Sequence, residues 1–161
     1  ADASKVLSQE LLDHLLTQFP LGNSTIHGED HWMRVLYNGR MLAKETGANL
    51  KVVELFALIH DCQRDNDGYD LEHGRRAAEY VNDIYDEWLD IDEKEKELLI
   101  EACKYHSDGL IDADITVQTC WDSDRLDLGR VGIKPSSDRL CTEVARRGDV
   151  IEEAYKRSIN Y

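Results

Sequence analysis

The apolar residues of this chain recur at helical spacing almost throughout, and few residues interrupt the pattern. Only 2 prolines and 10 glycines occur in 161 residues, so there are few positions at which a helix must end. Apolar residues three and four positions apart give each amphipathic helix one face to bury. Strand-like alternation is weak and confined to 111–117. The pattern predicts an all-α protein.

Proline, glycine and polar turns divide this pattern into successive helices. The expected helices span 7–19, 28–45, 50–63, 72–87, 92–104 and 117–128, with one or two more within 135–161. The helix at 50–63 is apolar around most of its circumference, so we expect it at the centre. We expect one domain over residues 1–161, built as a bundle of about six to eight helices.

Charge and composition limit the partners that the chain can have. A net charge of -14 argues against binding of polymeric nucleic acid, which needs a basic surface. A small anionic substrate is compatible, since a metal ion and a few arginines can make one cleft positive. No run approaches the length of a membrane-spanning helix and no targeting pattern precedes the first helix, so we expect a cytoplasmic protein without a membrane partner. The 4 cysteines include no C-x-x-C pair, which favours reduced thiols.

A histidine and an aspartate, His60 and Asp61, end the most apolar stretch of the chain, 52–59. Such a pair pays a desolvation cost unless a metal ion or a polar partner offsets it. Two neighbours on a helix point about 100° apart, so both can reach one ion at a seam between helices. His31 and Asp124 are ligands of the same types on other expected helices, and bundles build metal sites from facing helices. Each residue taken alone is equally compatible with an ordinary core or surface role.

Three blocks that contain these residues follow one another along the chain: HGEDHWMRV at 27–35, FALIHD at 56–61 and WDSDRLD at 121–127. Together they resemble the HD-domain superfamily of metal-dependent phosphohydrolases, over a stretch of about residues 26–129. The resemblance implies a helical HD domain that binds a divalent metal ion, with Mn, Fe, Co, Ni, Zn and Mg all open. It assigns the ligand role to the following side chains: His31, His60, Asp61 and Asp124.

Two further histidines, His73 and His106, lie between the HD pair and the last aspartate. Two-metal members of the superfamily use additional histidines in this interval, so the resemblance implies a second ion that Asp61 bridges to the first. The interval from Asp61 to His73 is shorter than in that pattern. The alternative is a single ion, with both histidines contacting the substrate or the ligands.

Two arginines share a helix face with an expected ligand: Arg34 follows His31 by three residues, and Arg64 follows His60 by four. The planar guanidinium group can pair with two oxygens of a phosphate. We therefore expect both arginines, with Asp61, to take part in catalysis. An ion pair with one of the 33 acidic residues is the equal alternative for each.

Other charged residues near the motifs have structural interpretations. Arg125, next to Asp124, is expected to form a structural salt bridge. Glu29 and Asp30 are expected either to support His31 or to supply the negative charge that the first turn of a helix favours.

The expected function is hydrolysis of a small phosphoester or nucleotide by a metal-activated water. A first alternative is a di-iron oxygenase, because a small branch of the superfamily binds two irons with a similar set of six ligands. A second is a non-catalytic regulatory HD module, against which the intact ligand set argues. The identity of the substrate, the general acid and the oligomeric state stay open.

Overall fold

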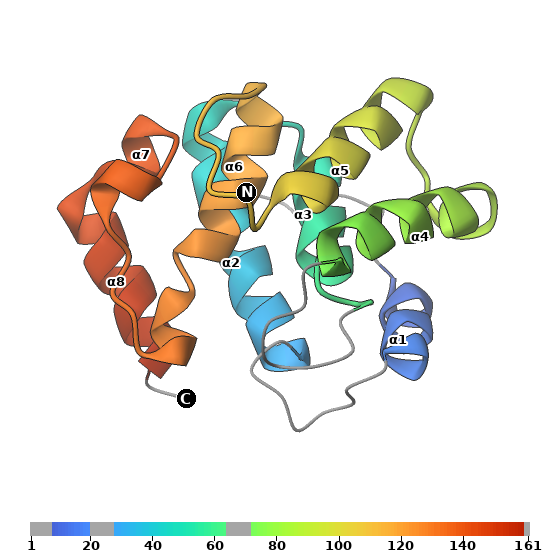
Figure 1. Cartoon of the computed structure of the whole chain (residues 1–161), viewed down its shortest axis with the longest axis horizontal. Coiled ribbons are helices and arrows are strands. Elements are labelled where there is room, and N and C mark those ends of the chain that lie inside the picture. The colour runs from blue at the N-terminus through green and yellow to red at the C-terminus, as the bar shows by residue number, and fades with distance from the viewer. Residues whose placement is uncertain (1–7, 20–27, 64–71, 160–161) are drawn as a thin grey trace.

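The computed structural model describes residues 8–19, 28–63 and 72–159. Within these ranges the chain forms eight α-helices, two short 3₁₀ helices and turns, with no strand (Figure 1). The predicted all-α class is confirmed. No helix in the described ranges is both long enough and apolar enough to span a membrane.

The helices follow the predicted order with small shifts at their ends. The α-helices are α1 Gln9–Gln18, α2 Glu29–Thr46, α3 Leu50–Ile59, α4 His73–Trp88, α5 Glu93–Tyr105, α6 Ile115–Arg125, α7 Glu143–Arg146 and α8 Gly148–Ile159. The 3₁₀ helices are η1 Leu128–Val131 and η2 Ser137–Arg139.

Local capping chemistry sets several of these ends. Asp92 and Glu95 form a capping box at the start of α5, and Gly47 closes α2 in the left-handed conformation with φ 76°. The weak alternation at 111–117 does not become a strand. Instead, the Asp114 carboxylate accepts a hydrogen bond from Thr116 N and starts α6 two residues before the expected position.

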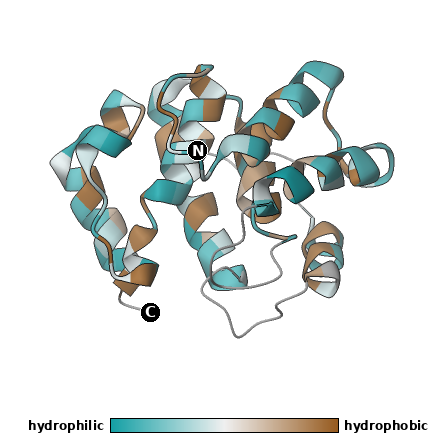
Figure 2. Cartoon of the chain, viewed as in Figure 1, coloured by the Kyte–Doolittle hydropathy of each residue, from teal (hydrophilic) through white to brown (hydrophobic). Residues whose placement is uncertain are grey.

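Helix α3 lies at the centre of the main core, as its apolar circumference predicts. Every residue from Val52 to Ile59 is buried, and α3 packs against α2, α5 and α6. Figure 2 shows hydrophobic residues along α3 and on the helices around it, and the largest fully buried side chains include Trp32, Phe56 and Trp121. Burial of each such side chain contributes roughly 1.5–3 kcal/mol. The helix ends one residue before His60, where Cys62 N donates to Ile59 O and tightens the turn.

A second, smaller core joins α7 and α8 to the rest of the molecule. It consists of Leu42, Leu126, Leu140, Val144, Ala145, Val150, Ile151 and Ala154. Next to it, η1 packs directly on α8 because Gly129 has no side chain: a Cβ there would collide with Ser158 and touch Tyr155. This close approach fixes the turn that follows α6.

Candidate metal centre

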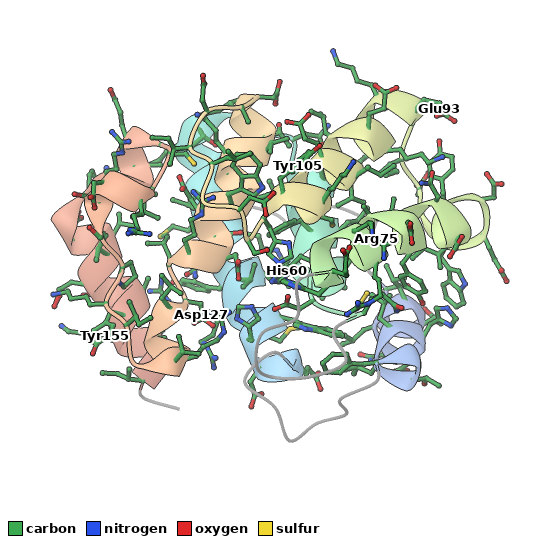
Figure 3. The ribbon with its side chains drawn as sticks, viewed as in Figure 1. His60, Arg75, Glu93, Tyr105, Asp127 and Tyr155 are labelled. Carbon is green, nitrogen blue, oxygen red and sulfur yellow. The ribbon has the colours of Figure 1, made fainter. Side chains whose placement is uncertain are left out.

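Six ionisable side chains meet where five helices begin or end. The first turn of α2, the end of α3, the first residue of α4, the end of α5 and the last turn of α6 each supply one or two of them. Five of the six are almost completely buried, and Figure 3 shows His60 near the middle of the molecule. The six side chains are His31, His60, Asp61, His73, His106 and Asp124.

Four of these side chains form a first cluster, with all ligand atoms within 4.8 Å of one another. His31 Nε2 and His60 Nε2 lie 3.1 Å apart. Asp61 Oδ2 is 3.3 Å from His31 Nε2 and 3.5 Å from His60 Nε2. Asp124 Oδ1 is 3.1 Å and 3.3 Å from the same two nitrogens. The structure thus brings together the four residues of the expected first site.

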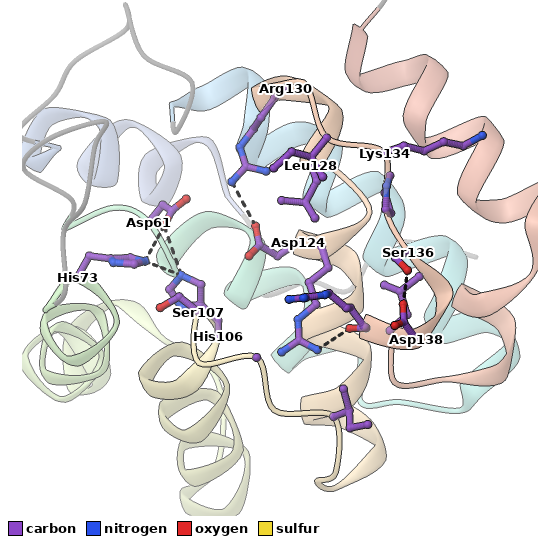
Figure 4. A pocket seen from close by; sticks show the side chains of 17 residues that line it. Asp61, His73, His106, Ser107, Asp124, Leu128, Arg130, Lys134, Ser136 and Asp138 are labelled. Carbon is purple, nitrogen blue, oxygen red and sulfur yellow. Dashed lines mark hydrogen bonds and ion pairs between the residues drawn. The ribbon is translucent and has the colours of Figure 1, made fainter.

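The second oxygen of Asp61 faces a second cluster. Asp61 Oδ1 lies 3.5 Å from His73 Nε2 and 3.4 Å from His106 Nε2, and the two imidazole nitrogens are 2.8 Å apart. Figure 4 shows His73 and His106 converging on Asp61 at one side of the cavity. The short interval before His73 does not prevent this arrangement, because α4 begins at His73 itself.

Backbone carbonyls fix the tautomers of two of the histidines. His60 Nδ1 is 2.9 Å from Phe56 O, and His106 Nδ1 is 2.7 Å from Cys103 O. A carbonyl oxygen can only accept, so each Nδ1 carries the proton and donates it. In the neutral ring the lone pair then sits on Nε2, the atom that faces the cluster. Phe56 also stacks on the His60 ring, with the ring centroids 4.6 Å apart.

A buried carboxylate holds the third imidazole. Asp127 Oδ2 lies 2.7 Å from His31 Nδ1, and its other oxygen accepts from Arg34 Nε at 2.7 Å. The Asp127 carboxylate therefore orients the His31 ring so that Nε2 points into the cluster. Glu29 and Asp30, which the sequence suggested for this support, lie in the first turn of α2.

In the first cluster, two imidazoles and two carboxylates thus direct their acceptor atoms toward one another in the protein interior. Asp124 Oδ1 is buried and lies close to the Nε2 atoms of His31 and His60 without a well-aligned hydrogen bond to either, which is costly unless a cation or a proton on one of these rings satisfies it. Burial and Arg130 lower the pKa of His31, but Asp124, Asp127 and Asp61 outweigh them and raise it to about 9. Two imidazoles and two carboxylates fit a divalent first-row ion, which would replace that proton.

The centre opens into a cavity of about 880 Å³. In Figure 4, Asp61, His73 and His106 line one side of it, and Lys134 and Ser136 line the other. Besides the acidic and imidazole groups, the lining contains four basic side chains: Arg125, Arg130, Lys134 and Arg139. This cavity can admit a small anionic molecule to the metal centre.

Arg130 is a site residue that sequence reasoning missed. Its Nη2 lies 3.9 Å from Asp124 Oδ1, and its side chain is 9% exposed. Nη1 donates to Asp127 O at 2.9 Å, which aims the guanidinium group along the wall of the cavity. The sequence feature that could have indicated this role is spacing: Arg130 lies three residues after Asp127, and the 3₁₀ helix η1 connects the two.

The arginines expected at the site have different positions. Arg34 does not line the cavity and binds Asp127 instead, so its catalytic role stays a prediction, and Arg64 lies outside the described residues. Arg125 lines the cavity, but within the described ranges no carboxylate forms an ion pair with it. The expected salt bridge of Arg125 is therefore not found.

Two comparisons with known proteins agree with this architecture. The sequence model of the HD domain matches residues 28–135. A crystal structure described as a predicted HD superfamily hydrolase, from an uncultured Thermotogales bacterium, has the same fold with a TM-score of 0.73 at 23% identity, over 94% of this chain and 87% of that one. No curated protein matches the chain. The matched residues contain both clusters and Arg130, and the resemblance of the three sequence blocks is confirmed: the chain belongs to the HD domain family.

Proposed function

We propose that this protein is a metal-dependent phosphohydrolase that acts on a small phosphoester or nucleotide. The observation that carries the proposal is the shared carboxylate of Asp61, whose two oxygens face two clusters of ligand atoms. The cavity in front of these clusters has four basic side chains, which favour an anionic substrate. Membership of the HD domain family supports a hydrolase.

Six side chains would hold the cations. His31, His60 and Asp124 would bind one ion, His73 and His106 would bind a second, and Asp61 would contact both. When bound, such ions supply Lewis acidity, which lowers the pKa of water and polarises phosphoryl oxygens. The mixed nitrogen and oxygen donors suit Mn, Fe, Co, Ni or Zn better than Mg.

The protein itself supplies orientation and charge. Asp127 and the carbonyls of Phe56 and Cys103 keep three imidazoles in the tautomer that directs Nε2 inward. Arg130 stands beside Asp124 on the cavity wall, and its buried Nε has no acceptor among the described residues. We assign Arg130 to the non-bridging oxygens of the substrate phosphate, where a fixed guanidinium group offsets the charge that develops during transfer.

Elemental analysis and a phosphatase panel test this proposal. The purified protein should contain a divalent transition metal and release phosphate from p-nitrophenyl phosphate or a mononucleotide when Mn, Co or Zn is added. Asp61→Ala should lose both the metal and the activity, because both clusters lose their shared ligand. Asp83→Ala, on the exposed face of α4, is the matched control and should keep both. A metal-free Asp61→Ala protein that still hydrolyses the substrate at the wild-type rate would contradict the proposal.

A di-iron oxygenase is the second candidate, favoured by the second cluster of His73, His106 and Asp61. This chemistry needs two irons, whereas hydrolysis can run with one ion or two. Protein purified in air should then be coloured, contain two equivalents of iron and consume oxygen in the presence of substrate. A colourless protein that is active with Mn or Co removes this candidate. A protein that contains no metal and hydrolyses nothing would instead point to a regulatory module.

A further inference from the structure

Arg125 is a cavity-lining guanidinium group that has no counter-charge among the described residues. It ends α6, directly after Asp124. Its Nη1 donates to Arg139 O at 3.1 Å and contacts Cys141 Sγ at 3.5 Å, both of which are neutral acceptors. Its guanidinium carbon lies 5.5 Å from the centre of the Trp121 ring. Nη2 is buried and has no hydrogen-bond partner in the described ranges.

Among the described residues no carboxylate pairs with Arg125, although the chain has 33 acidic and 19 basic residues. Two other part-buried arginines have a buried carboxylate as partner: Arg34 binds Asp127 and Arg40 binds Glu54. Arg157, which does not line this cavity, donates to Asn38 Oδ1 and lies over the Tyr37 ring. A part-buried charge that keeps unfilled donors costs free energy. At the wall of a binding cavity, that cost is offset when an anionic ligand binds.

The neighbouring charges leave this wall positive. Lys134 is paired with Glu152 at 2.6 Å, and Asp138 accepts a hydrogen bond from Ser136. Arg139 is exposed, and within the described residues it forms no ion pair. On this side of the cavity, the described lining residues thus offer the guanidinium groups of Arg125 and Arg139 against one carboxylate, that of Asp138.

The cavity that contains both these arginines and the proposed metal ligands has a partly apolar lining. The apolar side chains in the lining are Ile111, Leu128, Ile133, Pro135 and Leu140. Such a surface fits the carbon skeleton of a small molecule rather than a continuous chain of charged groups.

We propose that Arg125 and Arg139 form a second anion-binding subsite, so that the preferred substrate carries a phosphate or carboxylate group in addition to the phosphoryl group that is cleaved. This inference rests on the proposed phosphohydrolase function. The metal centre and Arg130 bind the reacting phosphoryl group, and the fork of Arg125 pairs with two oxygens of the other anionic group. The apolar wall contacts the carbons between them.

Binding of phosphonates tests the subsite without relying on turnover, because a carbon–phosphorus bond is not hydrolysed as a phosphoester is. Titration calorimetry compares butylphosphonate with α,ω-alkanebisphosphonates of two to six carbons. The wild-type protein should bind the best-fitting bisphosphonate at least about tenfold more tightly, as expected for one bidentate charged contact. Arg125→Gln should reduce this preference to within about twofold, and Arg125→Lys should restore part of it. Arg147→Gln, an exposed arginine that does not line this cavity, is the matched control and should keep the full preference.

The same proteins separate failure of the subsite from failure of the proposed function. Hydrolysis of butyl phosphate, which has no second anion, tests the function: the wild-type protein should release phosphate from it, and the control Arg147→Gln should keep the wild-type kcat/KM. A bisphosphonate preference that Arg125→Gln abolishes supports the subsite even when no phosphate is released. Equal affinity of the wild-type protein for butylphosphonate and every bisphosphonate overturns the subsite and leaves the function standing. Where Arg125→Gln does not fold, Arg139→Gln, at an exposed position, takes its place and must weaken the preference.

Discussion

At the scale of single residues, Asp61 determines how many ions the centre can hold. Each of its oxygens lies within 3.5 Å of two imidazole nitrogens, and the two pairs belong to different helices. An asparagine at this position would present an amide N–H₂ to one of the pairs and repel a cation there. Substitution of Asp61 and substitution of a ligand that belongs to one cluster should therefore lower the metal content by different amounts.

Metal stoichiometry is the first prediction. We expect two equivalents of Mn or Co in the wild-type protein, one in His73→Ala and fewer than one in Asp61→Asn. The reason is that His73 belongs to the second cluster alone, whereas Asp61 belongs to both. Elemental analysis after gel filtration measures these values. If His73→Ala retains the full wild-type content, the second cluster holds no ion.

The pH dependence of metal binding is the second prediction. In the metal-free protein the pKa of His31 is raised from 6.5 to about 9, so its proton stabilises the fold fully below about pH 6.5. That contribution is lost as the pH rises towards 9. A cation must displace the same proton and therefore binds more tightly at higher pH. Melting temperatures measured with and without Mn should diverge from pH 6 to pH 9, and a constant difference would contradict this assignment.

At the scale of secondary-structure elements, the Asp127 carboxylate ties α2 to the turn after α6. It accepts hydrogen bonds from His31 and Arg34, which are three residues apart on one face of α2. Through Asp127, the position of the proposed metal ligand His31 therefore depends on how α2 and α6, which are far apart in sequence, pack together.

Neutralisation of Asp127 is the third prediction. Asp127→Asn keeps the size of the side chain but weakens its hold on the His31 ring, and the affinity for Mn should fall about 10- to 100-fold. Addition of excess Mn should restore most of kcat, because Asp127 does not bind the ion itself. Arg34→Gln should show a smaller loss in the same direction. A variant with unchanged metal affinity would show that the tie has no effect on the ligand.

The contact between η1 and α8 gives the fourth prediction. In Gly129→Ala the added Cβ would collide with Ser158, which should cost about 1–3 kcal/mol of unfolding free energy and displace Arg130. Gly148→Ala is the matched control, since a Cβ at Gly148 meets nothing within 4 Å, and alanine there should be neutral or stabilising. Denaturant unfolding and kcat/KM for a phosphoester measure both effects. Equal stability of the two variants would contradict the close packing.

At the scale of the whole molecule, the metal centre connects five of the helices. Its six side chains come from α2, α3, α4, α5 and α6, and a bound cation would therefore stabilise the folded chain but not the unfolded one.

Metal removal is the fifth prediction. At a free metal concentration 100 times the Kd, binding stabilises the fold by about 2.7 kcal/mol per ion. For a chain of this size, loss of one ion should lower the melting temperature by about 5–10 °C. Calorimetry with and without a chelator measures the change. Asp61→Ala should melt at the same temperature under both conditions, and a similar shift in that variant would place the ion elsewhere.

Local patterns predicted most of the fold, because the apolar period lies within single helices, and the first cluster was predicted by the resemblance of three separate sequence blocks to the HD-domain superfamily. The apolar period placed α2, α3 and α5 within a few residues of their ends, and the three sequence blocks named the four residues of the first cluster. Arg130 and Asp127 were not predicted as site residues, because their roles depend on how the turn after α6 packs on α2 and α8. For Arg125 a structural salt bridge was expected, but the packing of the described residues provides none. That residues 1–161 form a single domain stays a prediction.

All six proposed metal ligands precede residue 125, whereas most of the basic and apolar cavity wall comes from 125–140. In the proposed function, the residues for the reaction and those for the choice of substrate therefore lie in separate stretches of the chain. Substitutions within 125–140 could change which molecules are accepted while the residues that carry out the chemistry remain unaltered. Relatives that keep the six ligands but differ in this segment should process different compounds by the same reaction.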